Sequence, residues 1–156
     1  MKRFLLIFIT AVLLFSAISC TEKEESYDID TADAARRFCE GLNFDDELVI
    51  LSDEKAQTLY GFGAKNITVY AGSGSTAEMI VVAEYENPNQ TAQGVQYIND
   101  YMAEKITIYS SYAPLEVEKL ENAFFHGFGN FAVCIVTADD CDLQTFAENI
   151  LKSYKK

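Results

Sequence analysis

Two neighbouring stretches of the chain have the hydrophobic pattern of β-strands, and they meet at a turn rich in glycine and serine. Residues 67–71 alternate between apolar and more polar side chains, which is the period of two expected of a strand. Residues 79–85 are apolar on both faces, which is typical of a strand covered on both sides. Gly72-Ser73-Gly74-Ser75 permits the positive φ of a tight reversal. The pattern predicts a hairpin whose second strand is the centre of a sheet.

The spacing of apolar residues predicts the elements around this hairpin. A repeat of three to four residues predicts helices at residues 31–41, 53–60 and 88–112, and from a cap at Asp139-Asp140 onward. Strands are predicted at residues 48–51, 123–128 and 131–137, the first of them buried. Leu59 is placed on the inner side of its helix, and residues 114–122 are predicted to form a turn.

The order of these elements, α-β-α-β-β-α-β-β-α, predicts one α+β domain. Strands joined in hairpins favour a mostly antiparallel sheet of four to five strands, with helices packed on it and covering one face. No repeat or second domain is visible in the 156 residues.

The N-terminus has the pattern of a targeting segment. A basic start is followed by the uncharged apolar run Phe4–Ile18, which has the length of a signal-peptide core. The residues before Cys20 resemble a bacterial lipobox, with Ala17 where Leu, Val or Ile is usual. The resemblance implies a signal peptide at residues 1–19, a lipid such as palmitate on Cys20, an acidic tether at 20–30 and a domain at 31–156. Secretion without the lipid and an uncleaved signal anchor are the alternatives.

The charge balance narrows the possible partners. The chain has 24 Asp and Glu against 12 Lys and Arg, a net charge of -12, which becomes -14 once Lys2 and Arg3 leave with the leader (-12 - 2). Such a surface is repelled by nucleic-acid phosphates and by anionic lipid head groups. We therefore expect no nucleic-acid partner, and contact with the membrane only through the lipid.

Some polar and aromatic residues are candidates for ligand contact. Gly72, Ser73, Gly74 and Ser75 could cradle an anion through their N–H groups, but they lack the ending of a P-loop and precede a strand, which favours a simple turn. Tyr101 and Tyr112 fall off the core stripe of the long helix and could stack on a sugar or a partner, or lie at the core edge.

Metal and redox chemistry have little support in the pattern. The single histidine, His126, excludes a site built on several imidazoles, and no CxxC motif occurs. Cys134 and Cys141 could form a disulfide, although buried free thiols, with Cys39, are the simpler interpretation. Acidic runs such as Asp139 to Asp142 suit helix capping better than calcium binding. No catalytic residue, metal or cofactor is predicted.

Several segments together resemble a known family. Leu59-Tyr60-Gly61, the GSGSTAEMIVV segment, YAPLEVEKLENA and GNFAVCIVTADD occur in the order found in bacterial lipoproteins with the DUF4358 domain of unknown function. The resemblance covers residues 44–151 and the leader. Ala113 separates Tyr112 from Pro114, and Phe131 ends a turn that is GNY-like in the family. The family has no established activity, so the resemblance implies lipid anchoring and a shared fold but transfers no catalytic residue.

These observations predict a monomeric, lipid-anchored and non-catalytic module at the outer face of the cell membrane. Its expected partner is an envelope protein or a cell-wall component. A carboxylate- or metal-dependent envelope hydrolase and a structural spacer or assembly factor are the alternatives. An enzyme needs converging carboxylates of raised pKa, whereas a binding module needs an exposed apolar or aromatic patch.

Overall fold

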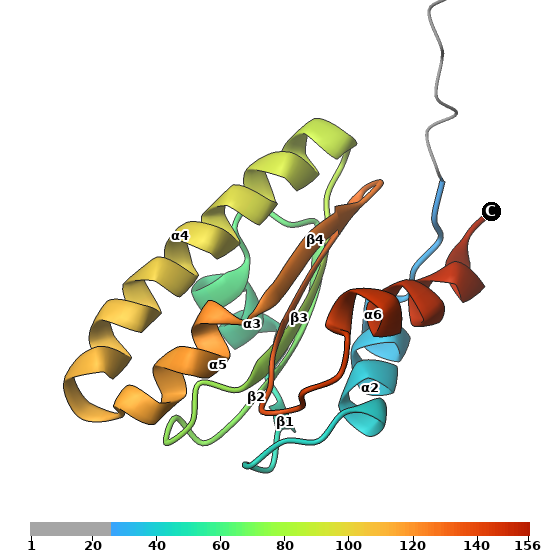
Figure 1. Cartoon of the computed structure of the whole chain (residues 1–156). Coiled ribbons are helices and arrows are strands. Elements are labelled where there is room, and N and C mark those ends of the chain that lie inside the picture. The colour runs from blue at the N-terminus through green and yellow to red at the C-terminus, as the bar shows by residue number, and fades with distance from the viewer. Residues whose placement is uncertain (1–25) are drawn as a thin grey trace, which may run out of the picture.

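The computed structural model describes residues 26–156, which form a five-stranded antiparallel sheet with helices on both faces (Figure 1). The predicted signal peptide and Cys20 lie outside the described residues. The elements are α2 (Thr31–Gly41), β1 (Val49–Ile50), α3 (Asp53–Tyr60), β2 (Asn66–Ala71), β3 (Met79–Glu84), α4 (Pro88–Tyr112), η2 (Pro114–Glu116), α5 (Val117–Glu121), β4 (Phe124–Phe128), β5 (Phe131–Val136), α6 (Leu143–Leu151) and η3 (Lys152–Tyr154). This arrangement confirms the predicted α+β class and element order.

The sheet has the strand order β1-β2-β3-β5-β4, so β3 is its middle strand, as predicted. β3 pairs along its whole length with β2 and with β5. Its residues from Met79 to Ala83 are all buried because helices cover both of its faces. β4 and β5 are joined by the two-residue turn Gly129-Asn130, in which Gly129 has a φ of 56°. Glycine at the first central position is what a type II′ hairpin turn requires.

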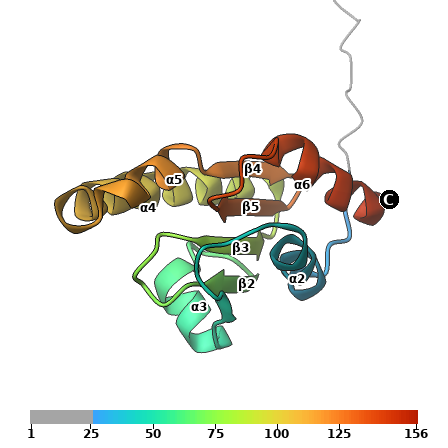
Figure 2. The same ribbon diagram turned by 60° about the horizontal axis from the view of Figure 1, so that its bottom comes forward.

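Helices cover both faces of the sheet, so the prediction that they cover one face is wrong. Figure 2 shows α2 and α6 on one side and α3, α4 and α5 on the other. Alternate residues of β3 divide accordingly: Val81 packs in the core under α4, whereas Ile80 and Val82 pack under α2 and α6. The two-faced apolar pattern of β3 results from this double cover, because each face needs its own layer of helices.

Side chains at the helix starts explain where the helices begin. Asn87 accepts a hydrogen bond from the Gln90 N–H at the start of α4, and Asp30 accepts two at the start of α2. α6 begins later than predicted, because Asp142 caps it by accepting from the Thr145 N–H. Asp139, which was predicted to cap this helix with Asp140, instead accepts from Asn43 and Cys141 in the preceding loop.

Three local predictions were also wrong. β1 is an exposed edge strand, with Val49 and Ile50 more than half exposed, because only β2 pairs with it and no helix covers it. Leu59 is 55% exposed, and Tyr60 takes the inner position of α3 beside Ala56. The predicted turn after α4 is helical, since η2 and α5 occupy most of it.

The connection between β2 and β3 is a loop of seven residues, 72–78, and not a tight reversal. Its last residue, Glu78, is 1% exposed and precedes the central strand. The Glu78 carboxylate accepts hydrogen bonds from the N–H groups of Asp45, Asp46 and Ala138 at 2.9–3.2 Å. Lys119 lies 3.5 Å from the same carboxylate. Glu78 thus joins the central strand to two loops and to α5.

The segment next to the predicted tether packs against the C-terminus. Tyr27 forms an antiparallel bridge with Lys155, and the Asp28 N–H donates to the Tyr154 carbonyl at 2.9 Å. Ile29 is 6% exposed in the core beneath α2 and α6. The packed domain therefore includes residues just before α2.

Replacing Glu78 with glutamine should lower the free energy of unfolding by about 3 kcal/mol. A neutral amide has one acceptor oxygen, so it leaves buried N–H donors without an acceptor. It also removes one of the three carboxylates around Lys119, which keeps Asp45 and Glu116. Urea denaturation measures the change. Glu118→Gln, an exposed site on α5, is the matched control and should shift stability by less than about 0.5 kcal/mol. Equal effects of the two substitutions would refute this role of Glu78.

Candidate functional site

The loop Gly72–Ser75, the first predicted ligand contact, binds a carboxylate of the chain itself. The N–H and the hydroxyl of Ser73 both donate to the Asp46 Oδ2 at 2.7 Å. These two hydrogen bonds lower the pKa of Asp46. The prediction that the loop could cradle an anion fits its chemistry, but the two Ser73 donors are already occupied by Asp46.

The acidic runs that were candidates for metal binding are likewise used within the fold. The pKa of Asp139 is lowered by hydrogen bonds from the backbone N–H groups of Asn43 and Cys141, and that of Asp142 by the Thr145 hydroxyl and N–H. Burial lowers the pKa of Lys119, but its hydrogen bonds with Asp45 and Glu116 outweigh burial and raise it overall. Between Ser26 and Lys156, no group of three His, Cys, Asp or Glu side chains is placed to hold a metal ion.

Cys134 and Cys141 are both free thiols, in keeping with the simpler interpretation, and the alternative of a disulfide between them does not form. Cys134 is buried in β5 on the face that α4 covers, away from α6. Cys141 is exposed in the loop before α6. Burial alone raises the pKa of Cys134 to about 12, which leaves it an unreactive thiol at neutral pH. His126 is exposed on β4 between the rings of Phe124 and Phe128.

The tyrosines of α4 differ in their surroundings. Tyr101 is partly buried between the rings of Tyr60 and Phe62, with Lys105 over its face at 5.1 Å. Tyr112 is 59% exposed and packs on Tyr109 at the end of the helix. Tyr112 lies about 16 Å along the helix axis from Tyr101, given 1.5 Å per residue. The two tyrosines predicted as ligand contacts therefore do not belong to one site.

An aromatic hollow lies between α4 and the loop that follows α3. Its volume is about 480 Å³, within the range of small-molecule sites. The rings of Phe62 and Tyr97 form its walls, nearly parallel at 13° with centroids 6.4 Å apart. Tyr97 is 55% exposed, so part of its ring is open to solvent. The lining residues are Phe62, Gly63, Tyr85, Gln90, Gln93 and Tyr97.

The backbone at Phe62 is strained. Its φ of 45° lies in the left-handed region, where a bulky side chain is an outlier, and the next residue, Gly63, has a φ of 80°. Holding such a conformation costs on the order of 1–3 kcal/mol, and strain of this kind clusters at binding sites. In return, the turn places the Phe62 ring against Tyr97 and Tyr101.

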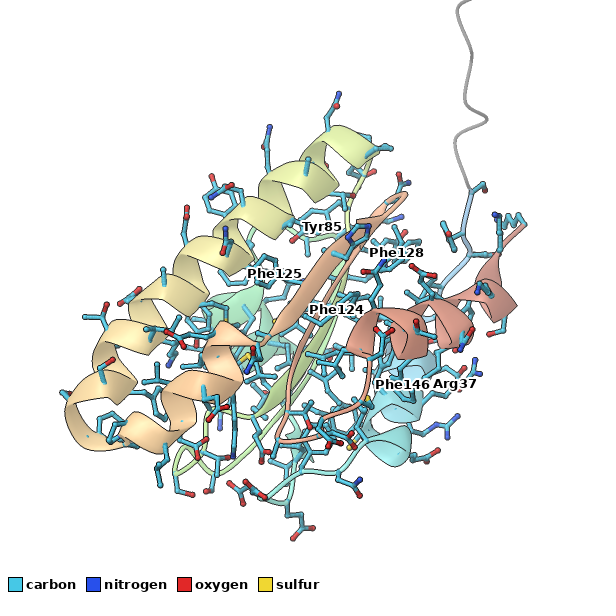
Figure 3. The ribbon with its side chains drawn as sticks, in the orientation of Figure 1. Arg37, Tyr85, Phe124, Phe125, Phe128 and Phe146 are labelled. Carbon is cyan, nitrogen blue, oxygen red and sulfur yellow. The ribbon has the colours of Figure 1, made fainter. Side chains whose placement is uncertain are left out.

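Tyr85 forms the floor of the aromatic hollow and lies beneath α4 (Figure 3). Its side chain is 1% exposed, and among the described residues its hydroxyl is buried without a hydrogen-bond partner. Burial raises the pKa of Tyr85 to about 12. A Cβ at Gly94 would lie 2.1 Å from the Tyr85 hydroxyl, so only glycine lets the ring reach this place.

Sequence reasoning missed this site, although signals were present. Gly94 stands in the interior of a long helix, where glycine is unfavourable and its presence calls for a packing reason. Phe62 stands between two glycines directly after α3, which in the sequence marks only the end of that helix. The pairing of the two positions depends on tertiary structure, because α4 and the loop are separated by two strands in the chain.

A larger groove of about 1130 Å³ runs along the edge strand β4 between α4 and α6. Phe125 faces α4 there, and Phe124 and Phe128 face α6 (Figure 3). Ser26 and Tyr27 line one end of the groove, next to the part of the chain that the structure does not describe.

Comparison with known proteins adds no assignment. The chain matches no protein-family model, and it matches neither a curated protein nor a solved structure. Membership of the DUF4358 family accordingly stays a prediction from the sequence motifs.

Tyr85→Phe should raise the free energy of unfolding by about 1–3 kcal/mol, because it removes a buried hydroxyl that has no partner. Tyr109→Phe is the matched control, since the Tyr109 hydroxyl donates to the Thr76 carbonyl at 2.8 Å. That variant should lose about 1 kcal/mol. Denaturant unfolding of both variants gives the comparison, and a loss of stability in Tyr85→Phe would show that its hydroxyl is satisfied.

Proposed function

We propose that this protein is a lipid-anchored binding module of the bacterial cell envelope and has no catalytic role. The anchor is the lipid on Cys20, and the binding site is the aromatic hollow. The leader pattern supports the anchor. In the described residues no helix combines the length and hydrophobicity needed to cross a membrane.

The observation that carries the proposal is the unpaired hydroxyl of Tyr85 at the floor of the aromatic hollow. A buried polar group without a partner lowers stability, so its retention calls for an explanation such as a bound ligand. The strained Phe62 and the half-exposed Tyr97 meet at the same place. Three features that each cost stability or solubility therefore coincide in one small hollow, which favours a binding role.

The alternative of a carboxylate-dependent hydrolase has weaker support. The described carboxyl groups whose pKa departs from the ordinary value are Asp33, Asp46, Asp139 and Asp142, and each is lowered. A general acid needs a raised pKa. Glu78 is enclosed by its own hydrogen-bond donors, out of reach of a substrate. A pure spacer would not need the features of the aromatic hollow.

The anchor would place the hollow near the membrane. The chain from Cys20 to Ser26 spans at most about 20 Å when fully extended. Thr31, at the start of α2, bonds to Thr68 in β2 through their hydroxyls at 3.0 Å. The chain thus enters the domain at the end of the sheet where β2 begins and β3 ends, and Tyr85 directly follows β3.

Cys20→Ala should move the protein from the membrane fraction to the soluble fraction and abolish its labelling with radioactive palmitate. The reason is that the lipid would be the only membrane contact. Cys39→Ala, which changes a cysteine within the domain, is the control and should stay in the membrane. Retention of the Cys20→Ala protein in washed membranes would contradict the anchor.

The binding role is tested by amide hydrogen exchange. The mature chain, kept soluble by Cys20→Ala, is mixed with a detergent-solubilised envelope fraction. A ligand in the aromatic hollow should slow exchange at residues 62–64 and 90–97. The loop Gly72–Ser75 is the internal control and should not change, because Asp46 already occupies its donors. Unchanged exchange around the hollow would argue against the proposal.

A further inference from the structure

The lining of the aromatic hollow is uncharged, which restricts its ligand. None of its six lining residues carries a charge, although the chain has 24 acidic and 12 basic residues. Lys65, two residues after Gly63, pairs with Glu84 at 3.3 Å, whereas Glu86, next to Tyr85, is exposed and outside the lining. A charged ligand would lose its hydration against the lining without gaining an opposite charge there, which is costly. The lining therefore favours a neutral ligand.

The aromatic walls favour a ligand with a flat apolar face. Tyr97 is 55% exposed, and the ring of Phe62 lies nearly parallel to its ring. Phe62 is held in place by its left-handed backbone and by contact with Tyr101. Such rings stack on the C–H face of a sugar, and a fixed platform loses little conformational entropy on binding.

The polar groups of the aromatic hollow suit hydroxyl groups. Gln90 uses its Oε1 to accept from the Glu86 N–H at 3.1 Å, which leaves its NH₂ group available. Within residues 26–156, Gln93 has no side-chain hydrogen bond. Each amide NH₂ donates and each amide oxygen accepts, and a hydroxyl does both. The Tyr85 hydroxyl is buried beneath these groups, against Gly94, so the two glutamines supply the polar contacts that are open to a ligand.

We infer that the aromatic hollow binds a neutral saccharide. One face of a sugar ring stacks on Tyr97 and Phe62, and its hydroxyls bond to Gln90 and Gln93. This inference rests on the proposed binding function and adds the chemical class of the ligand. In a membrane-anchored protein, such a site would hold the domain to the neutral glycans of the cell surface.

The test is a glycan array that carries neutral and anionic oligosaccharides, probed with the mature chain bearing Cys20→Ala. Neutral glycans should bind, and their affinity should be measured in solution by calorimetry. Tyr97→Ala should weaken the affinity at least about tenfold, a usual cost of removing an aromatic contact. Tyr112→Ala is the matched control, since Tyr112 is equally exposed on the same helix but outside the hollow.

Gln93→Ala gives a second measurement that does not depend on folding defects. Gln93 is exposed and makes no side-chain hydrogen bond within residues 26–156, so the variant should be as stable as the parent while its glycan affinity falls several-fold. Binding of anionic glycans alone, no neutral glycan bound at millimolar concentration, or neutral binding that Tyr97→Ala leaves unchanged would each overturn the inference. If no glycan binds but envelope extract still slows amide exchange at residues 62–64 and 90–97, the hollow binds a ligand that is not a neutral saccharide. The proposed binding function would then stand, and only the inference about the ligand's chemical class would be wrong.

Discussion

The central strand β3 has a buried polar side chain at each of its ends, and the fold depends on the one that is satisfied. Glu78 stands directly before the strand and accepts hydrogen bonds from three backbone N–H groups of two separate loops, with Lys119 beside it. A buried carboxylate is stable only with such partners. The geometry of the loops at this end of the sheet is therefore fixed by the position of β3. Through Lys119, the same carboxylate also fixes α5, which follows the long helix α4.

Tyr85, directly after β3, presents the opposite situation. Its ring is enclosed as completely as the Glu78 side chain, yet its hydroxyl has no partner among the described residues. The ring fits only because Gly94 has no Cβ, and glycine in a helix interior is less stable there than alanine. Natural proteins break local rules of this kind mostly at functional sites. One end of β3 thus serves stability, and the other end carries the features that stability alone does not explain.

The periodicity of apolar residues is a local signal, and it predicted the parts of this structure that depend on local sequence. These are the hairpin, the central strand and the stripe of α4 at Ile98, Met102 and Tyr109. Periodicity failed where a residue's partners are distant. Glu78 was not singled out, since nothing near it in the chain shows that Asp45 and Ala138 converge on it.

The prediction of helices on one face overlooked a signal that was present, as β3 is apolar on both faces. Of the two tyrosines predicted as contacts, Tyr101 only supports the Phe62 wall, and Tyr112 is remote.

The acidic surface and the neutral aromatic hollow have complementary effects on what can bind. A net charge of -12 repels anionic polymers and lipid head groups at long range, although salt screens this repulsion beyond about 10 Å. Cationic partners are attracted, but they would be held at the acidic loops and gain nothing in a hollow without a carboxylate. Neutral molecules alone are unaffected by the surface field, so their binding is decided by short-range stacking and hydrogen bonding. Because these forces act only in contact, the two rings must already be in place. The strained backbone at Phe62 meets that requirement before any ligand arrives.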